Sequence, residues 1–260
     1  MTTSGAIVLG THLAALSAGW QACDSASAMY SAATEAVALG YRVLEIPLFD
    51  PFTTPLPHLP SGPKPVDLWA YTALPPAMHL PWRPEHARRW LGHALEWCEA
   101  AGASHLVGAL AWSPAAHLVH PPNQSNFAFV VEVLRDCAQE AQRRGITLAI
   151  EPANRYETSF CNTLVQGVEL VNAIGMSNMR LLGNTLHTHL SEANTAAALS
   201  AAQDHLIGLH LAENTGGKLG GGAIAWESIW RTLGEMNFQG ALVITPWNET
   251  TMHDEAGGAS

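Results

Sequence analysis

The sequence has few charged residues, and few of those are basic. Charged side chains make up 13% of the 260 residues, and 12 basic residues face 22 acidic ones, which gives a formal net charge of −10. A nucleic-acid-binding surface needs a clustered excess of Lys and Arg. The acidic balance therefore argues against a nucleic-acid partner and favours a small-molecule substrate.

Cysteines are also few. The chain has four, at Cys23, Cys98, Cys137 and Cys161, and no two of them have Cys-x-x-Cys spacing. Cys98 and Cys137 fall on the apolar stripes of expected helices. That position is typical of buried, reduced thiols rather than of a disulfide framework or a cysteine metal site.

Long apolar runs are absent as well. No run approaches the ~20 residues that a membrane-spanning helix needs, which argues against a membrane partner. The apolar N-terminal stretch lacks a basic segment and is interrupted by Thr11 and His12. A first strand explains it better than a signal peptide does, and we expect a cytoplasmic protein.

What the chain does have is enough apolar sequence for a large core. Hydrophobic residues make up 48% of it, and α/β barrels fold as single units of about 250 residues. We therefore expect one domain over residues 1–260.

Short apolar runs alternate with helical patterns along almost the whole chain. The expected strands are Ala6–Gly10, Val43–Leu48, Leu68–Leu74, His105–Trp112, Ile146–Glu151, Met179–Asn184, Leu206–Leu211 and Ala241–Thr245. The expected helices are Ser27–Leu39, Pro84–Ala101, Phe127–Arg144, Thr163–Ile174, Ser191–Ala202 and Trp226–Glu235.

Nearly continuous apolar strands separated by helices indicate a parallel sheet covered by helices. Eight such units predict an α/β fold of the (β/α)8 TIM barrel type. Two units depart from the pattern. The stretch Pro51–Pro65 holds six prolines, so a loop is expected in place of the second helix. Only 13 residues follow Trp247, so the last helix is expected to be truncated.

In such a barrel the functional side chains lie at the carboxyl ends of the strands. Reading those ends in order gives Glu45, Trp112, Glu151, Asn184, His187, His210, Glu213 and Thr245. A carboxylate and an imidazole at neighbouring strand ends, such as Glu151 and His210, are a possible ligand pair for Mn²⁺, Co²⁺ or Mg²⁺.

Three motifs in this half of the chain carry a family resemblance. They are Glu151-Pro-Ala-Asn-Arg-Tyr-Glu157, Leu182-Gly-Asn-Thr-Leu-His187 and Leu209-His-Leu-Ala-Glu213. With them, the chain resembles the xylose isomerase-like TIM barrels, most closely the D-tagatose/D-psicose 3-epimerase branch. The similarity covers roughly residues 5 to 247.

The resemblance implies a divalent metal (Mn²⁺, Co²⁺ or Mg²⁺) held by Glu, Asp, His and Glu from strands five to eight. Glu151 and His210 match this set. Asn184 stands where the Asp is expected, and Thr245 where the last Glu is expected. Neutral oxygens bind a dication much less tightly than carboxylates do, so the metal site is degraded. The remaining candidate metal ligands are Glu151, His210 and Asn184.

In the family, two glutamates on opposite faces of a sugar pass a proton through an enediolate. The resemblance makes Glu151 the base and gives Glu157 and His187 catalytic and substrate-binding roles. With Thr245 the second base is missing, and Glu249, Asp254 or Glu255 from the tail is a possible replacement. The resemblance also implies a homodimer or homotetramer.

Other strand-end residues have weaker assignments. Trp112 and Trp247 are expected to form an aromatic wall of the pocket, and Asn184 to contact substrate. Barrel-rim carboxylates are commonly structural, and this is the favoured interpretation of Glu45 and Glu213.

The leading hypothesis is an isomerase or epimerase-like enzyme that abstracts a proton next to the carbonyl of a sugar or sugar-like hydroxy-carbonyl metabolite. Two alternatives remain open. One is a metal-independent lyase, tautomerase or cyclase in a biosynthetic pathway, with Glu151 as a lone base. The other is a non-catalytic barrel that binds a ligand or supports a partner.

Overall fold

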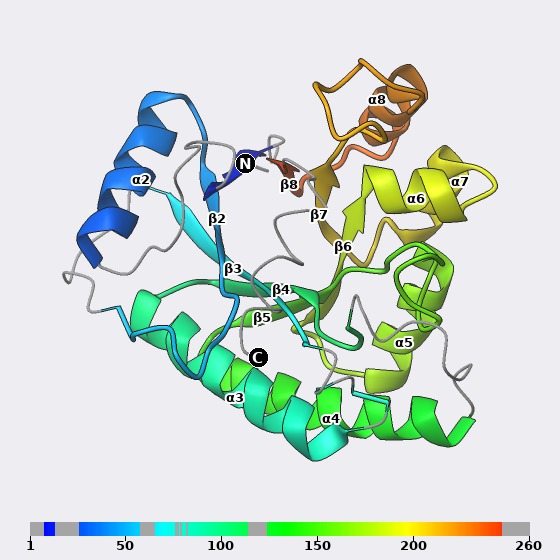
Figure 1. Ribbon diagram of the computed structural model, residues 1–260. Helices are drawn as coiled ribbons and strands as arrows, with labels where there is room; N and C mark the ends of the chain where they lie inside the picture. The colour runs from blue at the N-terminus through cyan, green and yellow to red at the C-terminus, as the bar shows by residue number, and fades with distance from the viewer. Residues whose placement is uncertain are drawn as a thin grey trace, which may run out of the picture.

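The computed structural model describes residues 8–13, 26–57, 66–75, 78, 80–81, 83–113 and 124–245. Within them, eight parallel strands form a closed barrel in sequence order, and β1 pairs with β8. Helices lie outside this barrel (Figure 1). The predicted (β/α)8 TIM barrel is confirmed.

Eight strands form the barrel wall. They are β1 (Val8–His12), β2 (Val43–Pro47), β3 (Asp67–Ala73), β4 (His105–Ala109), β5 (Thr147–Ile150), β6 (Met179–Asn184), β7 (Leu206–Leu211) and β8 (Ala241–Ile244). The helices in the described ranges are α2 (Ala26–Ala38), α3 (Pro84–Ala101), α4 (Gln124–Arg143), α5 (Leu164–Ile174), α6 (Thr185–Ser191), α7 (Thr195–Ala202) and α8 (Trp226–Glu235). None of these helices is long and apolar enough to cross a membrane.

Several predicted boundaries agree with the structure. Strands β6 and β7 and helices α3 and α8 have the bounds expected from the sequence. Helix α3 begins at Pro84, where a missing backbone N–H costs nothing. It ends at Gly102, which takes a left-handed φ of +58° that glycine tolerates better than other residues.

Two predictions about elements are wrong. Strand β4 ends at Ala109 rather than at Trp112, because Gly108 takes a φ of +119° and its carbonyl accepts the Leu110 N–H in a tight turn. The helix expected over Ser191–Ala202 begins only at Thr195, and a separate seven-residue helix, α6, follows β6 directly.

The structure describes only part of the second and eighth β/α units, which were expected to depart from the regular pattern. Residues 48–57, which follow β2, contain turns and no helix, as the prolines predicted. The rest of the Pro-rich stretch, residues 58–65, lies outside the described residues. So do residues 246–260, where the truncated last helix was expected.

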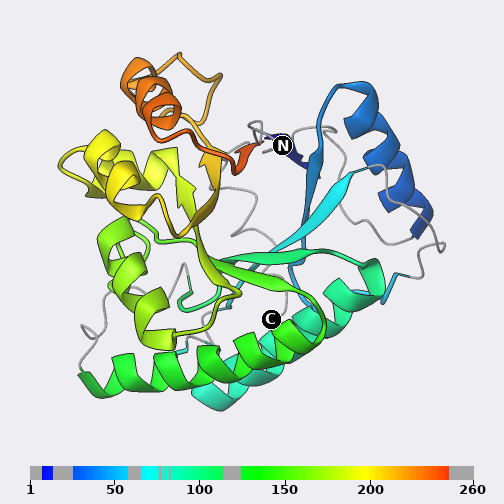
Figure 2. The ribbon, with the colours of Figure 1, turned by 180° about the vertical axis from the view of Figure 1, so that it is seen from behind.

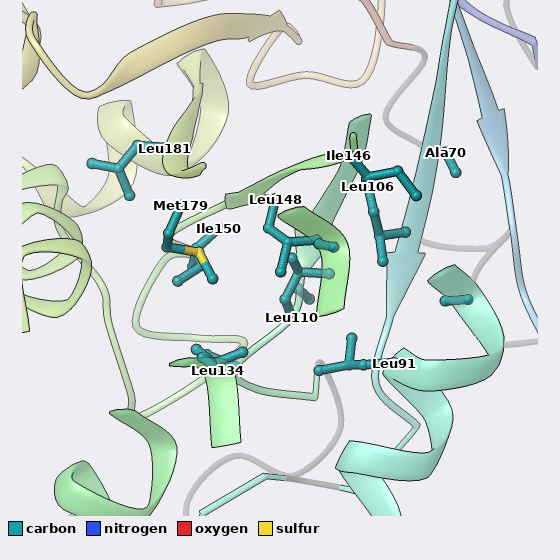
Figure 3. Close-up of a cluster of buried hydrophobic side chains, with 14 of the residues drawn as sticks. Ala70, Leu91, Leu106, Leu110, Leu134, Ile146, Leu148, Ile150, Met179 and Leu181 are labelled. Atoms are coloured by element: carbon teal, nitrogen blue, oxygen red, sulfur yellow. The ribbon is translucent and has the colours of Figure 1, made fainter. Parts of the chain in front are cut away.

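The main hydrophobic core lies between the barrel wall and the helices. The long helices α3 and α4 pack against each other along one side of the barrel, and α5 to α8 cover another part (Figures 1 and 2). In the close-up, Leu106, Leu148 and Ile150 meet Leu91 of α3 and Leu134 of α4 (Figure 3). All five are buried, and each contributes about 1.5–3 kcal/mol through burial of apolar surface.

A smaller cluster fills the barrel interior and forms the floor beneath the candidate site. Its members are Val43, Trp69, Tyr71, Val107, Ala149, Leu182, Ala241 and Val243. Side chains alternate between the two faces of a strand, so the residues two positions after these point to the same interior. This places the last interior residue of several strands at the carboxyl end of the barrel.

Candidate active site at the carboxyl ends of the strands

Five polar side chains follow interior apolar residues at that end. Two positions after Val43, Ala149, Leu182, Gly208 and Val243 come Glu45, Glu151, Asn184, His210 and Thr245. Asn184 and His210 are also register partners of the neighbouring strands β6 and β7. The period of two that builds the floor therefore also gathers these groups above it.

Glu151 is the central acceptor of the cluster. Its side chain is fully buried, and its Oε1 accepts hydrogen bonds of 2.8 Å from Nδ2 of Asn184 and 2.8 Å from Nδ1 of His210. The other oxygen, Oε2, is buried and has no hydrogen-bond partner in the described structure. A buried carboxylate oxygen without a donor leaves one acceptor site open for a ligand or a proton.

His210 joins Glu151 to a second buried carboxylate. Its Nε2 atom lies 3.0 Å from Oε2 of Glu45, on β2. Burial lowers the pKa of His210, but the charges of Glu45 and Glu151 and their hydrogen bonds outweigh it and raise the pKa to about 10. At neutral pH both ring nitrogens of His210 therefore carry a proton and donate.

The same contacts keep Glu151 ionised. Burial raises the pKa of this carboxyl group, but the charge of His210, with the hydrogen bonds from His210 and Asn184, outweighs burial. The net effect is a pKa below the ordinary value for Glu. Glu151 is therefore a carboxylate at neutral pH and can accept a proton.

Asn184 has two functions, one for each atom of its side-chain amide. Its Oδ1 accepts from the backbone N–H groups of Leu186 and His187, at 2.9 and 3.3 Å, and so forms the N-cap of α6. Because backbone N–H groups require an acceptor, the oxygen must face the helix. The Nδ2 donor is thereby directed at Glu151.

A second cluster of polar side chains, made of Asn154, Glu157 and His187, lies beside the cluster around Glu151. Nδ2 of Asn154 is 3.0 Å from Nδ1 of His187 and donates to Oε1 of Glu157 at 2.9 Å. Burial lowers the pKa of His187 to about 4, although the charge of Glu151 acts in the opposite direction. His187 is therefore neutral at physiological pH, and the tertiary structure places its Nδ1 3.7 Å from Oε1 of Glu157.

Thr245 follows β8, at the position where the sequence resemblance implies a Glu. Its Oγ1 is buried and has no hydrogen-bond partner in the described structure. The hydroxyl is uncharged, and it does not accept a proton at neutral pH as a carboxylate does.

The two tryptophans expected to line the pocket have different outcomes. Trp112 is 1% exposed, and its Nε1 donates to the Glu151 carbonyl oxygen at 3.0 Å, so the indole supports the backbone of the candidate base. Its predicted contact with substrate stays a prediction. Trp247 lies outside the described residues.

Sequence reasoning undervalued Glu45, which it interpreted as structural. The residue is fully buried, contacts His210, and has an Oε1 atom with no hydrogen-bond partner in the described structure. Its position in the period-two pattern after Val43 is the signal that could have found it. Glu213, by contrast, accepts from the backbone of Gly220 and from Nε1 of Trp226, which fits the structural interpretation.

The donor set of this cluster is poorly suited to a divalent cation. Both nitrogens of His210 lie within hydrogen-bond distance of carboxylate oxygens, so neither faces an open position. Asn184 turns its NH₂ group to the site, and Thr245 is neutral. In the part of the chain that the structure describes, no three His, Cys, Asp or Glu side chains are arranged to hold a metal ion. As arranged, these residues do not fit a tightly bound divalent ion.

What the cluster can do chemically follows from its charges. It offers one ionised carboxylate with an open acceptor position, the second N–H of the Asn184 amide, and a neutral imidazole at His187. A base beside N–H donors is the arrangement that abstracts a proton next to a carbonyl and stabilises the resulting oxyanion.

Comparisons with known proteins identify the family of this barrel. A family model described as xylose isomerase-like TIM barrel matches residues 44–259. A D-psicose 3-epimerase of Enterocloster bolteae is 32% identical over 145 residues, which are 55% of this chain and 48% of that enzyme. The chain thus aligns with about half of that relative's length. An L-ribulose 3-epimerase of Methylomonas sp. is 26% identical over 239 residues, covering 90% of this chain and 82% of the enzyme.

Solved structures show the same fold. The D-allulose 3-epimerase from Methylomonas sp. in complex with D-allulose superposes with a TM-score of 0.81 at 24% identity, covering 94% of this chain and 85% of that one. A D-psicose 3-epimerase with D-tagatose from Clostridium cellulolyticum gives a TM-score of 0.77 at 20% identity, with 98% and 93% covered.

Proposed function

The chain belongs to the xylose isomerase-like TIM barrel family, and from that premise we propose that it is an isomerase or epimerase-like enzyme acting on a sugar or sugar-like hydroxy-carbonyl compound. The observation that carries this proposal is the Glu151 carboxylate. It is fully buried at the end of β5, takes two N–H donors on Oε1, and keeps Oε2 without a partner in the described structure.

In the proposed reaction, Glu151 takes the proton from the carbon beside the substrate's carbonyl group. The electron pair of that C–H bond moves toward the carbonyl oxygen and gives an enediolate. The second N–H of the Asn184 amide would stabilise the developing negative charge. Asn154, Glu157 and His187 form the adjacent polar group that would orient the substrate hydroxyls. General base catalysis of this kind contributes about 10²–10⁴ in rate.

A second candidate is chemistry confined to one face of the substrate. Epimerisation needs an acid on the face opposite Glu151, and the family's last Glu is replaced by Thr245. If the proton returns from Glu151 to the former carbonyl carbon, and the hydroxyl proton moves between the two oxygens, the product is an aldose–ketose isomer. Elimination, tautomerisation or cyclisation with Glu151 as lone base belongs to the same class.

The experiment is proton exchange in D₂O, followed by NMR, with D-psicose, D-tagatose and L-ribulose as probes. Deuterium at carbon 3 of the ketose reports epimerisation chemistry, and deuterium at carbon 1 reports isomerisation. Glu151→Gln should lower exchange by about 10²–10⁴. The matched control, Glu169→Gln on the exposed face of α5, should leave exchange unchanged.

The opposite result would be equally clear. If the native protein binds one of these sugars without any exchange, and Glu151→Gln binds it equally well, the barrel is a ligand-binding protein rather than an enzyme. The homodimer or homotetramer and the cytoplasmic location implied above stay predictions.

A further inference from the structure

Three buried side chains form a continuous hydrogen-bonded chain across the barrel mouth. Glu151 on the β5 side contacts Nδ1 of His210 at 2.8 Å, and Glu45 on β2 contacts Nε2 of the same ring at 3.0 Å. The three side chains are at most 2% exposed. We refer to Glu45, His210 and Glu151 as the carboxylate–imidazole–carboxylate triad.

The triad leaves no ring nitrogen of His210 facing an open position. A histidine ligand binds a cation through an unprotonated nitrogen, yet each nitrogen of His210 faces a carboxylate oxygen. The neighbouring Asn184 also presents N–H, and its oxygen is held by the α6 backbone. The remaining oxygens, Oε2 of Glu151 and Oε1 of Glu45, have no hydrogen-bond partner in the described structure, and Oε1 of Glu45 lies 4.0 Å from Nε2 of His12.

The triad also balances the local charge. Two fully buried carboxylates without a positive partner would be strongly disfavoured, because burial removes the water that stabilises them. A divalent ion supplies that positive charge in a metalloenzyme. Here the imidazole of His210 lies within hydrogen-bond distance of both carboxylates and takes the place of that ion.

We propose that this triad replaces the divalent cation in the chain, so that the proposed proton abstraction proceeds without a metal, with Glu45 as the positioning residue that holds Nδ1 of His210 on Glu151. The catalytic part of this inference rests on the proposed function, whereas the part about metal binding does not.

Metal binding is tested first. The native protein, made without a metal-affinity tag, is dialysed against excess Mn²⁺, desalted and analysed by ICP-MS. It should retain no stoichiometric Mn²⁺. The double variant Asn184→Asp/Thr245→Glu puts carboxylates at the two substituted positions and should retain it. Asp caps a helix as well as Asn does, so α6 should be preserved.

Asn194→Asp is the matched control, because it makes the same change at the N-cap of α7 and should not create a metal site. Stoichiometric Mn²⁺ in the native protein, lost on His210→Ala, would overturn the proposal. So would a double variant that folds and still binds no Mn²⁺, since the two substitutions would then not be what excludes the metal.

The positioning role of Glu45 has a spectroscopic readout. In ¹⁵N-labelled protein, His210 should give two slowly exchanging downfield ring N–H signals, assigned by their loss in His210→Gln. Glu45→Gln should shift or remove the Nε2–H signal of His210. It should also lower the rate of proton exchange on the substrate more than it changes KM. Glu45→Asp should restore part of the signal and part of the exchange rate. A native spectrum with only one ring N–H from His210 would contradict the triad.

Activity then completes the test. Proton exchange by the native protein should be unaffected by EDTA, and loss in EDTA with recovery on adding Mn²⁺ would overturn the proposal. If none of the sugar probes reacts, the proposed function fails on its own, while the metal content and the histidine signals still decide the triad.

Discussion

The Oδ1 atom of Asn184 accepts a hydrogen bond of 2.9 Å from the backbone N–H of Leu186. This contact makes Asn184 the N-cap of α6, and it turns the Nδ2 atom of the same amide toward Glu151. The stability of a short helix and the environment of the candidate base therefore depend on one side chain.

Asn184→Ala should consequently cost more than the loss of an ordinary helix cap. An N-cap contributes about 1 kcal/mol, and a hydrogen bond to a charged group adds about 1.5–3 kcal/mol. We expect urea unfolding to show a loss of about 2–4 kcal/mol. The comparison is Asn194→Ala, which removes the single cap bond of α7 and should cost about 1 kcal/mol. Equal losses in the two variants would contradict the double role.

The buried, neutral His187 should make the free energy of unfolding depend on pH below about 7. Its pKa is lowered to about 4 by burial, while an unfolded histidine titrates near ~6.5. Between these values the unfolded chain binds more protons than the folded one, so the free energy of unfolding should decrease as pH falls from about 7 to about 4. The expected contribution is roughly 2–3 kcal/mol.

The measurement is chemical unfolding at a series of pH values for the native protein and for His187→Gln. Removing the buried imidazole should flatten the curve over this range. His93→Gln, which changes a partly exposed histidine on α3, is the control and should leave the curve unchanged. A native curve that is already flat between pH 4 and 7 would show that His187 is not buried in its neutral form.

Gly108 predicts a severe and local steric effect. A Cβ atom at this position would lie 2.4 Å from the carbonyl oxygen of Thr72, and the residue has a φ of +119°. Both the clash and the backbone conformation disfavour any other residue. Gly108→Ala should therefore lower the free energy of unfolding by about 2–4 kcal/mol.

Gly92 is a glycine at which the same change to alanine should raise the free energy of unfolding. It lies within α3, and a Cβ atom there would meet nothing within 4 Å. Gly92→Ala should stabilise the protein by about 0.5–1 kcal/mol, because alanine favours the helix. Thermal unfolding of both variants checks the pair, and a Gly108→Ala protein as stable as the native one would refute the geometry of β4.

Cys98, Cys137 and Cys161 are expected not to react with thiol reagents in the native protein. Cys98, Cys137 and Cys161 are free and buried, as the sequence suggested for the first two. Burial raises the pKa of all three, in the case of Cys137 and Cys161 to about 12. Since the thiolate is the reactive form, all three should react with a disulfide reagent such as DTNB only after denaturation. Rapid reaction of Cys137 in the native protein would contradict this, with Cys137→Ala identifying the signal.

The barrel itself was predictable because its determinants are local. Short, nearly continuous apolar runs, separated by helical patterns, locate β6 and β7 to the residue. Strand ends then point to Glu151, Asn184 and His210 as neighbours, since parallel strands end at the same rim.

Helix α6 could not be predicted in this way. Its seven residues follow β6 without a loop, and they start a helix because Asn184 caps two N–H groups. A strand-end asparagine has several possible partners. Only the barrel register, which pairs Asn184 with His210, fixes its amide between α6 and Glu151.

The sequence by itself determined the strand order, the apolar floor and the residue types at the strand ends, because each depends on neighbours close along the chain. Tertiary structure alone decided that Glu45 and His210, 165 residues apart, share a hydrogen bond. Strands β2 and β7 are separated in the barrel by β8 and β1, so their side chains meet only when the sheet closes on itself. That closure, and the burial that comes with it, turns the strand-end carboxylate of Glu45 into a hydrogen-bond partner of His210.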